Sequence, residues 1–149
     1  MNLIKHGNST HKNLTDASWG ELLTDIENHV PKEYGTQYRS SDKDTWAHES
    51  THGIHAYLNN NFGNPNYYCF YPGNNKAAKV KHPKFTIKDV ANALPVSLRE
   101  SRYNLYLVQQ TSQFNSRPLY LWDEWISYAN GAATGIELVN KGTYKPAKN

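Results

Sequence analysis

The chain has 149 residues, a formal net charge of +3 and a single cysteine. Its length is typical of one domain that buries about two thirds of its unfolded surface, and the lone Cys69 excludes an internal disulfide framework and cysteine-rich metal sites. The mild charge neither requires nor excludes an anionic partner, and no stretch approaches the roughly 20 apolar residues that span a membrane. We therefore expect one soluble domain over residues 1–149, with loose ends at 1–15 and 141–149.

The aromatic residues are the main source of a core. Mean hydropathy is −0.81, low for a globular protein, but the chain contains eleven Tyr, four Trp and four Phe, and each aromatic side chain buries a large area.

Met1 to Thr10 lacks the apolar segment of a signal peptide. The location stays open, since a secreted protein whose signal has been removed fits equally well, and so does the oligomeric state.

Two helices are predicted in the first half of the chain. Residues 16–29 carry apolar positions at helical spacing and end before Pro31. A loop follows, and Ser41 to Asp44 then fits a capping box that opens a second helix, which continues to the Asn59–Asn61 run.

A hairpin separates these helices from the C-terminal half. Residues 66–71 are aromatic and strand-like, Pro72–Asn75 is a strong turn, and residues 76–81 can return antiparallel. Two more helices and one short strand or helical turn are predicted after it, at 96–110, 118–138 and 85–93. The order of elements predicts a compact, helix-rich α+β domain with a small antiparallel sheet.

The second predicted helix contains His-Glu-x-x-His, at His48, Glu49 and His52. Residues four apart lie on one face of a helix, so both imidazoles can reach one Zn²⁺ ion at about 2.0–2.1 Å, and Glu49 can take a proton from a water molecule at the metal. Helix geometry places His55 about 10 Å along the axis from His48, too far to share the ion. On a helical wheel His48, His52, His55 and Asn59 form a stripe beside an apolar face, an arrangement typical of a cleft wall.

The motif resembles that of the zincins, metallopeptidases that carry His-Glu-x-x-His on a helix. It departs from the metzincin pattern, because Leu58 stands where the third His would fall. The resemblance therefore implies a gluzincin-like site, in which a carboxylate on a downstream helix is the third ligand. It also implies a peptide or protein substrate, which in such folds pairs with an edge strand; the hairpin 66–81 is the candidate.

Among the downstream groups, Glu124 is the first choice for the third ligand. It shares a helical face with aromatics and glycines that would let another helix approach closely, and a carboxylate there needs a partner. Glu100 is the second choice, and the remaining candidates are Asp89, Asp123, Glu137 and His82. Asp123 and Glu137 belong to a narrow polar strip that we expect to face solvent, together with Ser127, Asn130 and Thr134.

The function that these features predict is zinc-dependent peptide hydrolysis with Glu49 as general base. Zincins also supply a donor to the oxyanion; Tyr120 is the first candidate, followed by Tyr103, Arg102 and His55. Two alternatives remain: a non-catalytic module in which zinc is structural, with His82 as a further ligand, and a nucleic-acid binder or ribonuclease. The latter would use the lysines between residues 76 and 88, although lysine on an exposed strand also prevents aggregation.

Overall fold

The computed structural model describes residues 2–4, 16–36 and 42–144. Its helices are α1 (Gly20–Glu27), α2 (Lys43–Phe62), α3 (Ile87–Ala93), α4 (Ser101–Tyr103), α5 (Thr111–Phe114) and α6 (Tyr120–Asn140). Single turns are η1 (Lys32–Tyr34), η2 (Val96–Leu98) and the π-helical η3 (Asn104–Gln109). The strands are β1 (Asn2–Ile4), β2 (Tyr67–Gly73) and β3 (Lys76–Lys81). The predicted α+β class is confirmed.

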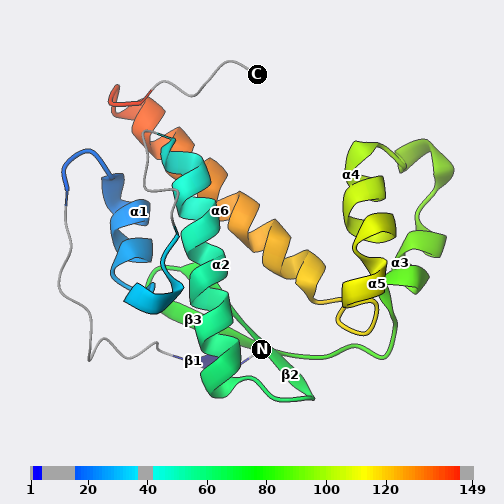
Figure 1. Ribbon diagram of the computed structural model, residues 1–149. Helices are drawn as coiled ribbons and strands as arrows, with labels where there is room; N and C mark the ends of the chain where they lie inside the picture. Colours follow the sequence, from blue (N-terminus) through cyan, green and yellow to red (C-terminus); the bar gives the residue numbers. More distant parts are fainter. Residues whose placement is uncertain (1, 5–15, 37–41, 145–149) are drawn as a thin grey trace.

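The two long helices, α2 and α6, lie side by side in the middle of the molecule (Figure 1). Gly131 of α6 makes their close approach possible, since a Cβ atom there would lie 2.8 Å from the Asp44 carbonyl oxygen and 3.3 Å from the His48 Cβ. In Figure 1, α1 packs on one side of this pair and α3 to α5 form a separate arm beside the start of α6.

The three strands form one antiparallel sheet in the order β1-β3-β2. The predicted hairpin is confirmed: Asn74 and Asn75 both have positive φ, 58° and 53°, as a two-residue type I′ turn requires. β1 lies inside the segment that was expected to be loose. Its residues, Asn2–Ile4, are instead paired with β3. Residues 141–144 of the predicted loose C-terminus are described, and the Tyr144 hydroxyl donates to the Asp44 carboxylate at 2.6 Å. The remaining residues of the predicted loose ends, 1, 5–15 and 145–149, lie outside the described residues.

The core lies between α1, α2 and the sheet, and it is rich in aromatic side chains as expected. The apolar face predicted for α2 is buried, with Ala47 and Ile54 fully inaccessible and Leu58 3% exposed. The largest buried side chains from the other elements are Tyr71, Phe70, Leu23, Ile26 and Ile87.

Helix boundaries differ from the prediction at two places. α2 is capped by Asp42, whose carboxylate accepts from the Thr45 amide, rather than by the predicted box at Ser41, a residue outside the described range. The helix predicted at 96–110 begins only at Ser101 and continues to Phe114. The Arg99 guanidinium donates to carbonyl oxygens near the end of α3, at Leu94 and Ala91, and the backbone turns away there.

The predicted solvent face of α6 was wrong. Ser127 and Thr134 are fully buried and Asn130 is 6% exposed, whereas the apolar Trp125 and Ile136 are 67% and 63% exposed. Neighbouring elements supply hydrogen-bond partners to Asn130 and Glu137, whereas the buried Thr134 hydroxyl has none among the described residues. Asn130 donates to the Thr51 hydroxyl and the Tyr71 carbonyl, and the Glu137 carboxylate accepts from the first amides of α1, at Glu21 and Leu22.

Candidate metal centre

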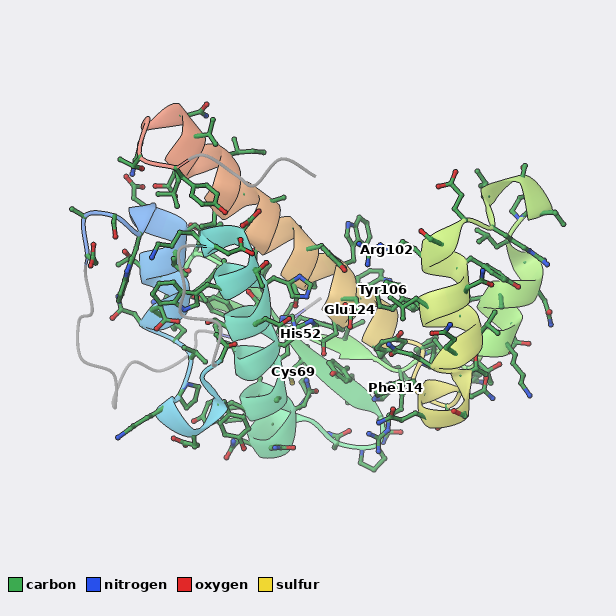
Figure 2. The ribbon with its side chains drawn as sticks, turned by 45° about the horizontal axis from the view of Figure 1, so that its top comes forward. His52, Cys69, Arg102, Tyr106, Phe114 and Glu124 are labelled. Carbon is green, nitrogen blue, oxygen red and sulfur yellow. The ribbon has the colours of Figure 1, made fainter. Side chains whose placement is uncertain are left out.

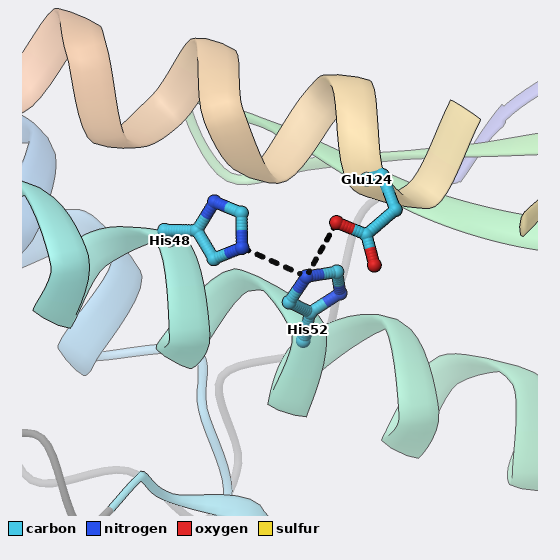
Figure 3. Close-up of side chains that lie close together, drawn as sticks. All are labelled: His48, His52 and Glu124. Carbon is cyan, nitrogen blue, oxygen red and sulfur yellow. Dashed lines mark hydrogen bonds and ion pairs between the residues drawn. The ribbon is translucent and has the colours of Figure 1, made fainter. Parts of the chain in front are cut away.

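Three metal-ligating side chains converge where α2 and α6 are closest. His48 and His52 extend from consecutive turns of α2, and Glu124 faces them from α6 (Figure 3). Nε2 of His52 lies 3.1 Å from Nε2 of His48 and 3.8 Å from Oε2 of Glu124, and all three donor atoms lie within 4.8 Å of one another. Two donors on one tetrahedral zinc ion are about 3.3 Å apart, given bonds of about 2.0–2.1 Å. The three atoms are therefore close enough that small side-chain shifts would let one ion contact all of them.

Glu49 lies beside this cluster and in an open cavity. The cavity has a volume of about 310 Å³ and is lined by Asp44, Thr45, His48, Glu49, Tyr128, Gly131 and Ala132. The Glu49 charge contributes to the titration of both His52 and Glu124. Within the described part of the chain its carboxylate makes neither a hydrogen bond nor a salt bridge, so it is available to a molecule in the cavity.

Asp123 holds His52 in place from the side opposite the donor atom. Its Oδ1 accepts hydrogen bonds from Nδ1 of His52 at 2.7 Å and from Nδ1 of His55 at 2.6 Å, and its Oδ2 accepts from the Tyr68 hydroxyl at 2.7 Å. A carboxylate on Nδ1 fixes the tautomer that leaves Nε2 free for a metal. Sequence reasoning assigned Asp123 to solvent and missed this role; its adjacency to Glu124 was the available signal.

His55 takes no part in the donor cluster, in agreement with the helix geometry. It is fully buried, and its Nε2 has no hydrogen-bond partner among the described residues. The predicted cleft wall is thus only half correct: His48 and His52 are half-buried beside the cavity, whereas His55 belongs to the interior. His52, His55 and Asp123 are also close enough to be considered as ligands. Their separations of 2.6–2.7 Å are those of hydrogen bonds and are short for two ligands of one ion.

Burial is the largest influence on the pKa values of the three donor groups. Burial and the neighbouring His52 lower the pKa of His48 to about 4, so this imidazole is neutral near pH 7. Burial alone would lower the pKa of His52, but the hydrogen bond to Asp123 and nearby carboxylates raise it. Burial raises the pKa of Glu124 above its ordinary value despite the opposing effect of His52. A metal ion would offset the cost of holding that carboxylate charged.

The pKa of Asp123 moves in the opposite direction. Burial alone would raise it, but the hydrogen bonds from His52 and His55 outweigh burial and hold it well below its usual range. Asp123 is therefore an anion at neutral pH, as a carboxylate that orients a ligand histidine has to be.

Tyr120 contacts its neighbours rather than the cavity at Glu49. Its ring stacks on Phe114 with centroids 4.4 Å apart, and its hydroxyl donates to the Tyr106 carbonyl at 3.4 Å. Two other tyrosines lie beside the donor cluster. Tyr128 packs on His48 with ring centroids 4.4 Å apart, and its hydroxyl lies 2.9 Å from that of Tyr106.

The remaining candidates for the third ligand lie outside the cluster. Glu100 is exposed just before α4, and Asp89 forms the capping box of α3 with Thr86. Glu137 caps α1 and pairs with Lys141. His82 lies next to Tyr68, with ring centroids 6.0 Å apart, and it is not among the donors grouped with His48 and His52.

No protein-family model, curated protein or solved structure matches this chain. Among the helices that the structure describes, none combines the length and apolar character needed to cross a membrane.

Proposed function

We propose that this protein is a zinc-dependent peptidase. The observation that carries the proposal is the convergence of His48, His52 and Glu124 beside a cavity that also contains Glu49. Two imidazoles and one carboxylate suit zinc, and three protein ligands are the number found in catalytic sites, which keep a further position open.

Each group around the cavity would have a separate role in hydrolysis. Zinc held by the three donors would polarise the substrate carbonyl and acidify a water molecule. Glu49 would accept the proton of that water and deliver it to the nitrogen of the leaving amine. Asp123 would keep Nε2 of His52 directed at the metal throughout.

A pair of tyrosine hydroxyls is available to stabilise the oxyanion. Tyr128 lies against His48, Tyr106 lies against Tyr128, and the Arg102 guanidinium donates to the Tyr128 hydroxyl at 2.8 Å. The positive charge of Arg102 makes the hydroxyl that accepts from it a stronger donor to a nearby anion. This arrangement favours Tyr128 and Tyr106 over Tyr120 as oxyanion donors, because the Tyr120 hydroxyl points to a backbone carbonyl.

The open cavity supports catalysis over a purely structural metal. A structural zinc site is closed by four protein ligands, whereas in the part of the chain described here three donors gather and His82 is apart from them. A structural site also needs no carboxylate at the position of Glu49.

Zinc analysis and peptide cleavage by Glu49→Gln test the proposal. The wild-type protein is expected to bind about one equivalent of zinc and to cleave a mixed peptide library, with activity lost on chelation. Glu49→Gln should retain zinc and lose cleavage, and the matched variant Glu100→Gln should retain both. Cleavage retained by Glu49→Gln would refute the general base. Zinc bound at one equivalent by a protein that cleaves no peptide would instead support the structural alternative, and RNA binding that weakens with salt would support the nucleic-acid alternative.

A further inference from the structure

A second cavity adjoins the candidate metal centre at Glu124, and Glu49 is not among the residues that line it. It has a volume of about 360 Å³ and is lined by Arg102, Tyr106, Leu121, Glu124, Trp125 and Tyr128. Figure 2 shows Arg102 and Tyr106, from the arm, on one side of Glu124 of α6, and His52 of α2 on the other side. Because Glu124 is both a wall of this cavity and a candidate ligand, a group bound here lies next to the reacting carbonyl.

The walls of this second cavity are mainly aromatic and apolar. Trp125 is 67% exposed and Tyr128 41% exposed, although large aromatic side chains are normally buried. Their rings, with Tyr106 and Leu121, offer a surface on which a large apolar side chain would be removed from water. The cavity lies within the range of about 300–1,000 Å³ typical of sites for small organic groups.

Arg102 adds a positive charge to the same cavity. One of its terminal nitrogens donates to the Tyr128 hydroxyl, and the guanidinium carbon lies 5.2 Å from the Tyr128 ring centroid. No acidic side chain pairs with it among the described residues. Its remaining N–H groups are free to bind a carboxylate through two parallel hydrogen bonds.

Arg102 and the ligand candidate His48 both lie against Tyr128. His48 and Arg102 contact the same Tyr128 ring, at 4.4 Å and 5.2 Å from its centroid. Because Glu124 and Arg102 line the same cavity, a substrate with its scissile carbonyl at the metal would place its next residue in the cavity that contains the guanidinium.

We propose that the second cavity binds the C-terminal residue of the substrate, and this inference rests on the proposed peptidase function. A large aromatic side chain packs against Trp125 and Tyr106, and the free α-carboxylate pairs with Arg102. The protein then acts as a carboxypeptidase. The last C–N amide bond breaks, water supplies a hydroxyl to the acyl carbon and a proton to the nitrogen, and one aromatic amino acid is released.

Matched peptides test this specificity on the zinc-loaded full chain. One peptide ends in Phe with a free carboxylate, a second ends in Phe amide, and a third ends in Ala with a free carboxylate. We expect the first to be cleaved at its last bond with a kcat/KM at least about tenfold above either of the others. Equal rates for the acid and the amide would overturn the role of Arg102, and equal rates for Phe and Ala would overturn the role of the aromatic walls.

Two variants assign these preferences to the cavity. Arg102→Gln should abolish the distinction between acid and amide, and Trp125→Ala should reduce the distinction between Phe and Ala. The controls are Arg117→Gln and Phe85→Ala, which replace exposed residues outside both cavities. An unchanged preference in Arg102→Gln or Trp125→Ala refutes the assignment.

A binding measurement separates failure of this inference from failure of the peptidase proposal. N-acetylphenylalanine should quench tryptophan fluorescence of the zinc-loaded protein at lower concentration than N-acetylphenylalanine amide does, and Trp125→Phe should remove the response. If this difference is present and no peptide is cleaved, the cavity is assigned correctly and the peptidase function is wrong. If peptides are cleaved but the two ligands bind alike, the specificity inference alone is refuted.

Discussion

Replacing Asp123 with asparagine tests whether this residue orients a ligand or is itself one. The carboxylate is 15% exposed and accepts from His52, His55 and Tyr68 at 2.6–2.7 Å. Asparagine has nearly the same shape and keeps one oxygen for the two imidazoles, while its amide can donate to the Tyr68 hydroxyl. The substitution therefore removes the negative charge and leaves most of the packing intact.

The expected loss of zinc affinity follows from that geometry. If Asp123 orients His52 through Nδ1, zinc affinity should fall about 10- to 100-fold, or about 1.4–2.7 kcal/mol. Competition with a chromophoric chelator at pH 7.5 measures the change, and circular dichroism confirms that the variant is folded. Asp89→Asn is the control, because it weakens an exposed helix cap and should leave zinc affinity unchanged.

Two results would refute this reasoning in different ways. Unchanged affinity in a folded Asp123→Asn protein would mean that the hydrogen bond does not orient His52. A loss well above a thousandfold, matched by a similar loss in His55→Gln, would mean that His52, His55 and Asp123 bind the metal instead of His48, His52 and Glu124.

Three further predictions use the same structure. Gly131→Ala should destabilise the fold by about 1–3 kcal/mol in urea unfolding and weaken zinc binding, because its Cβ would lie 2.8 Å from the Asp44 carbonyl oxygen of α2. Gly135→Ala should be neutral or stabilising, because its Cβ would lie 3.6 Å from the nearest atom, the Asp44 Cβ. Equal effects of the two substitutions would contradict the packing argument. Tyr106→Phe should lower kcat by about 10²-fold with zinc retained, whereas Tyr120→Phe should have little effect; the reverse order would restore Tyr120 as the oxyanion donor. The depressed pKa of Asp123 contributes stability that is present above its unfolded pKa of about 3.9 and is lost as pH falls through the folded value. The melting temperature of the chelator-treated protein should therefore fall between pH 5 and pH 2, less steeply in Asp123→Asn, and identical slopes would count against the linkage.

The local part of the site could be predicted because it depends on helical spacing alone. His48, Glu49 and His52 belong to one helix, so their mutual geometry follows from 3.6 residues per turn. The hairpin was equally local, since two adjacent asparagines favour the positive φ values of its turn. Glu124, which the structure brings near the two histidines, was selected as the carboxylate on a helix face of aromatics and glycines.

The orientation of α6 could not be predicted in the same way. Periodicity correctly grouped Ser127, Asn130 and Thr134 on one face, but it does not say whether that face meets water or polar partners. Here the partners come from α2, β2 and α1, which are distant in sequence. Several apolar residues of α6, including Trp125, are exposed to solvent. Hydropathy alone therefore predicts the wrong face of this helix to be buried.

Arg102 was among the candidate oxyanion donors, but its contacts with Tyr106 and Tyr128 could not be predicted from the sequence. Arg102 and Tyr106 come from a segment whose helix begins five residues later than predicted and passes through a π-helical turn. Only the packing of that arm against α6 brings them to Tyr128.

If zinc binds as proposed, the hydrogen bonds of Asp123 would also couple its binding to the folding of the segments between His52 and Asp123. His52 and Asp123 are 71 residues apart, and β2, β3 and the arm α3 to α5 lie between them in sequence. Tyr68 of β2 contacts the same carboxylate. Zinc that binds only the assembled site would therefore stabilise the native state as its concentration rises, by about 2.7 kcal/mol at a hundred times its Kd. In a chain with one cysteine, such an ion would connect distant segments as a disulfide does elsewhere, with the difference that a chelator can remove it.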